Sequence, residues 1–389
     1  MQVYLDNSAT TRLDERVFEK MKPYLTEKYG NASSIHFMGE ENSLTLLKAK
    51  EQIGRILNCD HSNLIFTSGA TESNNMVLKG VMRSNKDPEP SSGGGNHILV
   101  SAIEHPSILE TAKQLKEEGF DVEYIPVDSS GVVDLTQIKK MVRPETLLIS
   151  VMAVNNEIGT IQPVETIGAF ARKKGILFHT DAVQAVPYKT IDIRGWNADF
   201  LSLSAHKFNG PKGVGLAYIN RRVKIRPFMA GGGQEYGLRS GTHNLPGIVG
   251  MAEALRLAYE EQDEIVKKVS ELSAYFWKRI QEEIEDVQLN GDLKNRNPNN
   301  LNIMFRRIEG EAILMDLSTK GICVSTGSAC SSNKLQASNI LKAIGLKDND
   351  LNSNIRFTLG KFNTKEEIDY TVGALKETVA RLRSFTPLK

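Results

Sequence analysis

A lysine at the end of an apolar segment is the most informative residue of the sequence. The segment LSLSAHKFNGPKG begins at Leu201, so Ser204, His206 and Lys207 stand between a hydrophobic stretch and a Gly-Pro-Lys-Gly turn. Partial removal from water lowers a lysine pKa toward neutrality, which yields the free amine that Schiff-base chemistry requires. A solvated lysine on a turn is the alternative, and Lys207 taken alone does not exclude it.

A carboxylate follows an earlier apolar segment in the same way. The sequence HTDAVQ places His179, Asp181 and Gln184 at a predicted strand end, where α/β sheets bind ligands. If Lys207 holds pyridoxal phosphate (PLP), the pyridinium nitrogen needs an acidic partner, for which Asp181 is the candidate. Asp181 could instead cap the next helix. Zinc is not expected here, because the sequence has no Cys-x-x-Cys motif and no second histidine cluster.

Three further polar segments also follow apolar stretches. SGATESNN, with Ala70 and Thr71, predicts a helix N-terminus that binds an anion, or one that is simply capped by its hydroxyl residues. EHPS places His105 where an imidazole could stack on a ring and move protons. NNEIG, with Asn156, follows the next predicted strand in the same manner. Active sites of α/β enzymes are assembled from such strand ends, so the sequence predicts a cofactor enzyme with a lysine-bound aldehyde.

The elements that must position these residues are short apolar strands alternating with helices between about residues 40 and 220. Their continuous Val, Ile, Leu and Phe content is typical of strands buried in a parallel sheet. The predicted strands are Asn63–Thr67, His97–Ala102, Val122–Val127, Leu147–Met152, Ile176–Thr180, Phe200–Ser204 and Val214–Ile219. Strand–helix alternation predicts an α/β domain with a doubly wound, mainly parallel sheet.

The pattern changes after Pro246, where a long helical tract runs to about Glu285 and is followed by strands and helices in mixed order. We therefore expect a large PLP-binding α/β domain of residues 15–255. Residues 1–14 and 256–389 are expected to form a smaller α+β domain. The Pro-, Ser- and Gly-rich stretch Ser84–Asn96 is typical of a surface loop.

Composition excludes several classes of protein. The 389 residues carry 48 Lys+Arg and 47 Asp+Glu, so a net charge of +1 gives no support for nucleic-acid binding. Three cysteines cannot form a disulfide framework. The N-terminus has no secretory signal, and no apolar run approaches the roughly 18 residues of a membrane span. These features predict a cytoplasmic protein that does not enter a membrane.

Motifs in the same order along the whole chain resemble the cysteine desulfurase family, which belongs to the PLP-dependent class V aminotransferases. They are YLDNSATT, GNASSIH, SGATESNN, EHPS, NNEIGTIQPV, HTDAVQ, SAHKFNGPKG, GGGQE, RSGT, STGSAC and IRFTLG. The resemblance implies a homodimeric fold-type I enzyme that converts L-cysteine to L-alanine. It also implies that the sulfur remains as a persulfide on a cysteine and then passes to an acceptor. The acceptor would be an iron–sulfur scaffold or another protein, such as one that takes part in tRNA thiolation.

The resemblance implies roles for the matching residues. Lys207 would carry PLP, Asp181 would pair with the pyridinium nitrogen, and His105 would stack on the ring and take part in catalysis. Arg356 would hold the substrate carboxylate, helped by Asn156. The remaining cofactor contacts would be Ala70, Thr71, Ser204 and His206 at the phosphate, and Asn156 and Gln184 at the phenolic oxygen. Thr242 would reach the phosphate bound by the partner subunit.

Cys330 would be the nucleophile, on a small, polar loop of the long-loop class found in nitrogen-fixation and iron–sulfur-assembly desulfurases. Cys330 could also ligate an iron–sulfur cluster, and no other metal ligand is expected. Cys323 and Cys59 are expected to be buried small residues. The alternatives are a selenocysteine lyase, a related PLP-dependent aminotransferase, or a non-catalytic protein that binds a persulfide or a scaffold.

Overall fold

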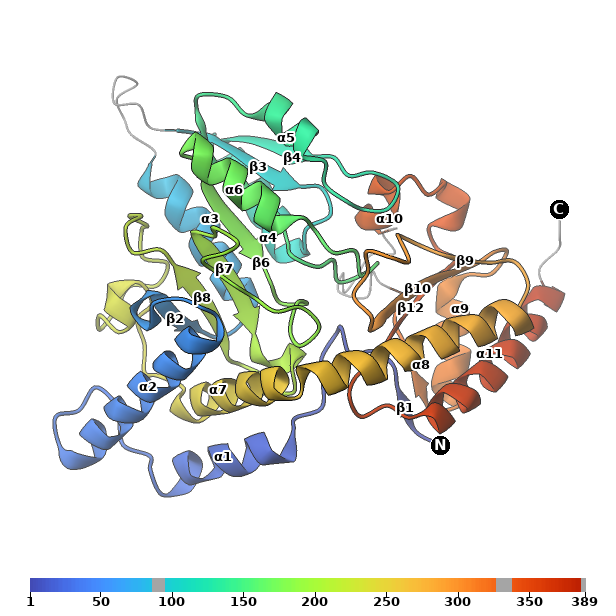
Figure 1. Ribbon diagram of the computed structural model, residues 1–389, viewed down its shortest axis with the longest axis horizontal. Coiled ribbons are helices and arrows are strands. Elements are labelled where there is room, and N and C mark those ends of the chain that lie inside the picture. Colours follow the sequence, from blue (N-terminus) through green and yellow to red (C-terminus); the bar gives the residue numbers. More distant parts are fainter. Residues whose placement is uncertain (86–94, 327–337, 386–389) are drawn as a thin grey trace.

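A seven-stranded sheet forms the centre of the larger part of the protein in the computed structural model, which describes residues 1–85, 95–326 and 338–385 (Figure 1). Its strands are β2 (Leu64–Thr67), β3 (His97–Ser101), β4 (Asp121–Ile125), β5 (Thr146–Ser150), β6 (Leu177–Asp181), β7 (Phe200–Ser204) and β8 (Gly215–Ile219). The spatial order is β2-β8-β7-β6-β5-β3-β4, and only β8 runs antiparallel to its neighbours. All seven predicted strands and the mainly parallel sheet are confirmed.

Helices cover both faces of this sheet (Figure 1). The helices of the larger part are α1 (Glu15–Thr26), α2 (Phe37–Ile56), α3 (Ala70–Ser84), α4 (Pro106–Glu117), α5 (Leu135–Met141), α6 (Val164–Lys174) and α7 (Leu245–Glu260). One face packs against α3 and α4 through a core that includes Ile98, Val100 and Phe200. The other face packs against α2, α6 and α7. Because strand side chains alternate between faces, the continuous apolar strands supply both cores at once.

The smaller part of the protein contains β9 (Val287–Leu289), β10 (Asn300–Phe305) and β12 (Asn354–Thr358) in one antiparallel sheet. Strand β1 (Val3–Tyr4) pairs with β11 (Ile322–Cys323). The helices here are α8 (Gln262–Glu283), α9 (Gly310–Thr319), α10 (Asn339–Ala343) and α11 (Lys365–Phe385). Val3 and Leu5 share a hydrophobic core with residues of α8, α9 and α11. The expected domain boundaries at residues 14/15 and 255/256 remain predictions.

The direction of the strands determines where the functional residues meet. Strand β8 is antiparallel to both β2 and β7, so β2 runs in the same direction as β7 and as the parallel strands β3, β5 and β6. The carboxyl ends of these five strands therefore lie along one edge of the sheet. Within the described residues, no helix has both the length and the apolar character to cross a lipid bilayer.

Candidate active site

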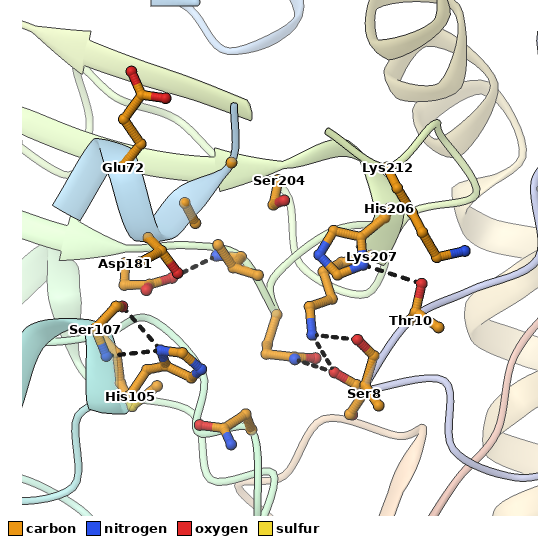
Figure 2. Close-up of a pocket in the computed structure, with 18 of the residues that line it drawn as sticks. Ser8, Thr10, Glu72, His105, Ser107, Asp181, Ser204, His206, Lys207 and Lys212 are labelled. Carbon is orange, nitrogen blue, oxygen red and sulfur yellow. Dashed lines mark hydrogen bonds between the residues drawn. The ribbon is translucent and has the colours of Figure 1, made fainter. Parts of the chain in front are cut away.

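One pocket of about 570 Å³ lies at this edge and brings most of the predicted site residues together (Figure 2). A volume of this size suits a cofactor-sized ligand. The predicted residues that line it are Ala70, Thr71, His105, Asn156, Asp181, Gln184, Ser204, His206, Lys207 and Arg356. The five strand ends thus converge on one cavity, as the sequence predicts.

Lys207 ends a 3₁₀ turn, Ala205–Lys207, that directly follows β7. Its ammonium group donates hydrogen bonds to the backbone carbonyls of Ser8 and Ala9, the latter at 2.9 Å (Figure 2). Gln184 Nε2 donates to the same carbonyl of Ser8 at 3.0 Å. The N-terminal segment therefore forms a wall of the pocket and orients the lysine. No pattern in the sequence marks Ser8, Ala9 or Thr10 as site residues, since their function here rests on backbone carbonyls and on contacts between distant segments.

Asp181 is the last residue of β6 and is almost completely buried. Asn74 Nδ2 donates to its Oδ2 at 2.8 Å, and the backbone N–H of Val183 donates to its Oδ1 at 3.0 Å. These bonds fix the carboxylate at the base of the pocket. Asn74 is not among the residues predicted from the sequence, although it lies four residues after Ala70 and hence on the same face of α3. The buried Glu104 has a pKa raised well above its usual value by burial and by the charge of Asp181.

His105 caps the N-terminus of α4, so its ring is held close to the backbone. Its Nδ1 accepts a hydrogen bond from the Ser107 N–H at 3.1 Å and lies 2.9 Å from the Ser107 hydroxyl (Figure 2). Burial lowers the pKa of His105, which favours a neutral imidazole. Because Nδ1 accepts, the neutral ring carries its hydrogen on Nε2. His105 can therefore offer a polarised N–H to a ligand in the pocket.

The N-terminus of α3 lies on the wall of the same pocket and carries Ala70 and Thr71. Its N-cap, Gly69, gives no side-chain cap, so the first N–H groups of the helix are available to an anion. Gly215 on β8 passes so close that a Cβ there would lie 2.5 Å from Gly69 Cα. Backbone packing thus sets the position of the helix end.

Further polar groups surround this helix end. Ser204, His206 and Lys212 line the pocket, and His206 Nδ1 lies 3.1 Å from the Thr10 hydroxyl. Burial, together with the charges of Lys207 and Lys212, lowers the pKa of His206 to about 4. His206 is therefore neutral at pH 7, and Lys212 adds positive charge to the pocket. Lys212 was not among the predicted residues, although it lies in the same GPKG turn.

Arg356 reaches the pocket from β12, in the smaller part of the protein. Its Nη2 forms an ion pair with Asp6 Oδ1 at 2.7 Å, and its Nη1 donates to the Asn156 carbonyl at 3.1 Å. Its buried Nε has no hydrogen-bond partner among the described residues. Each terminal nitrogen thus makes one bond, and the guanidinium retains N–H groups that can donate to a carboxylate.

Two predicted residues are not among the described residues that line this pocket. Thr242 is exposed and does not line the cavity, and Cys330 lies outside the described residues. The prediction that Cys323 is buried is wrong. Strand β11 has only two residues, of which Ile322 enters the core, so side-chain alternation turns Cys323 outward. Cys59 is partly buried, and burial, with the charge of Asp60, raises its pKa to about 12.

The residues present fit PLP. The uncapped end of α3 and Lys212 suit a phosphate, and the fixed carboxylate of Asp181 suits a pyridinium. Asn156 Oδ1 is a buried polar atom on the wall without a partner among the described residues. Lys207 supplies the only kind of side chain that forms a Schiff base with an aldehyde.

Comparison with known proteins gives matches over nearly the whole chain. The family model "Aminotransferase class-V" matches residues 3–371. A cysteine desulfurase IscS of Dictyoglomus turgidum is 45% identical over 388 residues, which cover 100% of this chain and 97% of that protein. A mitochondrial cysteine desulfurase of Arthroderma benhamiae is 45% identical, covering 99% of this chain and 76% of that protein.

Solved structures give the same picture. A "NIFS-like protein" superposes with a TM-score of 0.91 at 41% identity and covers 98% of this chain and 100% of that chain. A structure titled "SspA in complex with cysteine" superposes with a TM-score of 0.82 at 34% identity, covering 93% of this chain and all of that chain. The fold is therefore that of the PLP-dependent fold-type I enzymes.

Proposed function

The chain belongs to the class V aminotransferase family, and on that premise we propose that it is a cysteine desulfurase. The family and the desulfurases within it depend on PLP. The observation that carries the proposal is the meeting of Lys207, Asp181, His105 and Arg356 in one pocket. A PLP enzyme that acts on an amino acid can use all four groups. The lysine binds the aldehyde, the acid pairs with the pyridinium, the imidazole stacks on the ring, and the guanidinium binds the substrate carboxylate.

The net change in the proposed reaction is the transfer of one sulfur atom from the substrate to Cys330. L-cysteine and the Cys330 thiol yield L-alanine and a Cys330 persulfide. The Cβ–Sγ bond of the substrate breaks, an S–S bond forms at Cys330, and the substrate carbon takes up a proton. The sulfur bound to Cys330 then passes to an acceptor thiol. No external oxidant or reductant is needed for this half of the cycle.

PLP would be held by Lys207 through its aldehyde, by Asp181 at the ring nitrogen, and by the end of α3 at the phosphate. Ser204, His206 and the backbone at Ala70 and Thr71 would complete the phosphate site, with Asn156 and Gln184 at the phenolic oxygen. When bound, PLP supplies an electron sink that stabilises negative charge at the substrate Cα. The buried hydrogen bonds from Asn74 and Val183 hold the Asp181 carboxylate in position to pair with the ring nitrogen.

The chain's own residues would bind the substrate and move its protons. Arg356, fixed by Asp6, would orient the substrate carboxylate through its remaining N–H groups. Lys207 Nζ, as the base, would take the proton from Cα. His105 would donate a proton or a hydrogen bond from Nε2, since its Nδ1 is engaged by Ser107. Cys330 would attack the substrate sulfur as a thiolate.

The assembly and setting are proposed on the same basis. Thr242 is exposed, which is compatible with its reaching a partner subunit's phosphate in a homodimer. The sulfur acceptor is proposed to be a protein thiol. It belongs either to an iron–sulfur scaffold or to a protein that takes part in tRNA thiolation. Cytoplasmic location and the division into domains 15–255 and 1–14 with 256–389 also remain proposals.

Product analysis tests the function. The purified holoenzyme is incubated with L-cysteine and a thiol reductant, and alanine and sulfide are measured together. Equal amounts of the two products are expected from the wild type, and neither from Lys207→Ala or Cys330→Ala. Cys323→Ala is the matched control, because this exposed cysteine lies seven residues earlier and should leave turnover unchanged. Wild-type turnover in Cys330→Ala would contradict the proposal, and absence of turnover in the wild type would refute it.

A further inference from the structure

A second group of ligand-type side chains lies at the opposite end of the large sheet from the pocket. His97 is the first residue of β3, and Asp121 and Glu123 are the first and third residues of β4. The site residues follow the carboxyl ends of the strands, whereas these three lie near the amino ends. Strands β3 and β4 lie side by side at the edge of the sheet (Figure 1).

The parallel register brings the three side chains to one face of the sheet. His97 is paired with Asp121, and Leu99 is paired with Glu123. Residues two apart on a strand share a face, so Asp121 and Glu123 point to the same side as His97. One ligand atom from each residue lies within 4.8 Å of the other two. Three donors in such a group can close around one ion with a modest change of the carboxylate torsions.

The histidine is the observation that points to a ligand. His97 is completely buried, and its Nε2 has no hydrogen-bond partner among the described residues. This atom faces Glu123 Oε1 at 3.6 Å, which is too far for a hydrogen bond. A buried ring nitrogen left without a partner costs free energy unless something binds it. The nearest candidate is a cation shared with the two carboxylates.

The other nitrogen of the ring is held as it is in metal-binding histidines. His97 Nδ1 lies 2.8 Å from the hydroxyl of Thr146, the first residue of β5. Thr146 Oγ1 also accepts the backbone N–H of Arg143 at 2.8 Å, and its second lone pair can accept from Nδ1–H. With hydrogen on Nδ1, the lone pair of Nε2 is directed at the carboxylates. Such a hydrogen bond on the far nitrogen fixes ring orientation in metal sites.

Arg143 competes for the same carboxylates. Its Nη1 lies 2.6 Å from Asp121 Oδ2, and its guanidinium also contacts Glu123. The Arg143 side chain is about as exposed as that of Asp121, so it can swing into solvent when a metal enters. A dication gains from both carboxylates and from Nε2, whereas the guanidinium as it is placed makes no hydrogen bond to Nε2. Arg143 should therefore weaken metal binding rather than prevent it.

We propose that His97, Asp121 and Glu123 form a site for one divalent first-row transition-metal ion of the zinc class. One imidazole and two carboxylates suit such ions, with water in the remaining position. The site is separate from the PLP pocket and does not depend on the proposed function. A bound ion would fasten edge strand β4 to β3. Sequence spacing did not suggest it, because the ligands come from two strands that only the sheet register brings together.

Cobalt(II) binding tests the proposal, since its visible d–d absorption reports an ordered site. Chelator-treated, desalted holoenzyme is titrated with CoCl₂, and ZnCl₂ is then added to displace the cobalt. One cobalt per chain is expected in the wild type. Glu123→Gln and His97→Gln should weaken binding by about tenfold or more. Arg143→Gln should tighten it several-fold, by removing the competing cation. Glu260→Gln, an exposed carboxylate paired with Arg256 on α7, is the matched control.

Cysteine ligation would give a different signal, because thiolates add intense near-ultraviolet charge-transfer bands to cobalt(II). Binding that is unchanged in both Glu123→Gln and Arg143→Gln would overturn the proposal, as would absence of binding in the wild type. His97 is buried, so His97→Gln is interpreted only if its circular dichroism is native. The pair formed by Glu123→Gln and Arg143→Gln, both at partly exposed positions, decides the question without it.

Discussion

Asp6 Oδ1 lies 2.7 Å from Nη2 of Arg356, although 350 residues separate the two in the chain. The ion pair joins the N-terminal segment to β12 at the wall of the pocket. Nη1 of the guanidinium donates to the Asn156 carbonyl, and the buried Nε has no partner among the described residues. A substrate carboxylate is the ligand that such a half-satisfied guanidinium would accept best.

Arg356→Lys should raise the KM for L-cysteine by about tenfold or more with a smaller change in kcat. A lysine keeps the charge but cannot form the two-pronged contact with a carboxylate. Steady-state kinetics of alanine formation would measure both constants. Asp6→Asn, which loosens the guanidinium without removing it, should give a smaller rise in KM. An unchanged KM in Arg356→Lys would rule out substrate-carboxylate binding by this residue.

Asp181→Asn should keep the shape of the pocket but reduce kcat by about 10²-fold or more, because the amide cannot stabilise a protonated ring nitrogen. Asn74→Ala should have an intermediate effect, since it removes the donor that fixes Asp181 Oδ2. Turnover and the absorption spectrum of bound PLP would be followed in parallel. Wild-type turnover with a wild-type spectrum in Asp181→Asn would contradict the assignment.

Gly215→Ala should weaken retention of PLP. The new methyl group would lie 2.5 Å from Gly69 Cα and would push the N-terminus of α3 away from the phosphate position. Dialysis followed by measurement of the bound cofactor would detect the loss. Gly373→Ala is the control, because a Cβ on α11 meets nothing within 4 Å. That variant should keep its cofactor and gain up to about 1 kcal/mol of stability. Equal retention in both variants would disprove the role of this close approach.

Glu157 should make the protein less stable as the pH rises from about 4.5 to about 7. Burial raises its pKa to about 7, although the Ser338 hydroxyl 2.5 Å away and the charge of Arg356 oppose the shift. In this pH window the folded chain keeps a proton that the unfolded chain has released, so the free energy of unfolding falls as the pH rises. Above about pH 7 both states have released the proton, and this contribution no longer changes with pH. The full effect is about 3 kcal/mol.

Glu157→Gln should remove that part of the pH dependence. The variant and the wild type should have similar stability near pH 4, and the variant should be the more stable above pH 7. Denaturant unfolding at a series of pH values would measure the difference. Glu165→Gln, at an exposed position on α6, is the matched control and should follow the wild type. A difference that does not vary with pH would contradict the raised pKa.

Much of this architecture could be predicted because its signals are local. Continuous apolar runs such as Val214–Ile219 predict buried strands, and the polar residue that follows each run marks a strand end. Once the strands were taken as parallel, their ends had to meet. The sequence therefore predicts one site for Lys207, Asp181 and His105, and all three line one pocket of the structure.

The remaining features depend on pairings between distant segments. The carbonyls of Ser8 and Ala9 reach Lys207 across about 200 residues of chain, and no side-chain type marks a carbonyl that serves as a ligand. The exposure of Cys323 depends on which residue of a two-residue strand faces the core. The apolar sequence around it could not decide that question. The group of His97, Asp121 and Glu123 likewise exists only through the register of β3 and β4.

The most direct test of the account is to identify the lysine that carries the cofactor. Borohydride reduction of the holoenzyme would fix PLP covalently to that side chain, and peptide mass spectrometry would locate it. We expect the label on Lys207 and none on Lys212, which lines the same pocket. A label on Lys212 or on any lysine outside the pocket, or no label at all in protein that contains PLP, would contradict it.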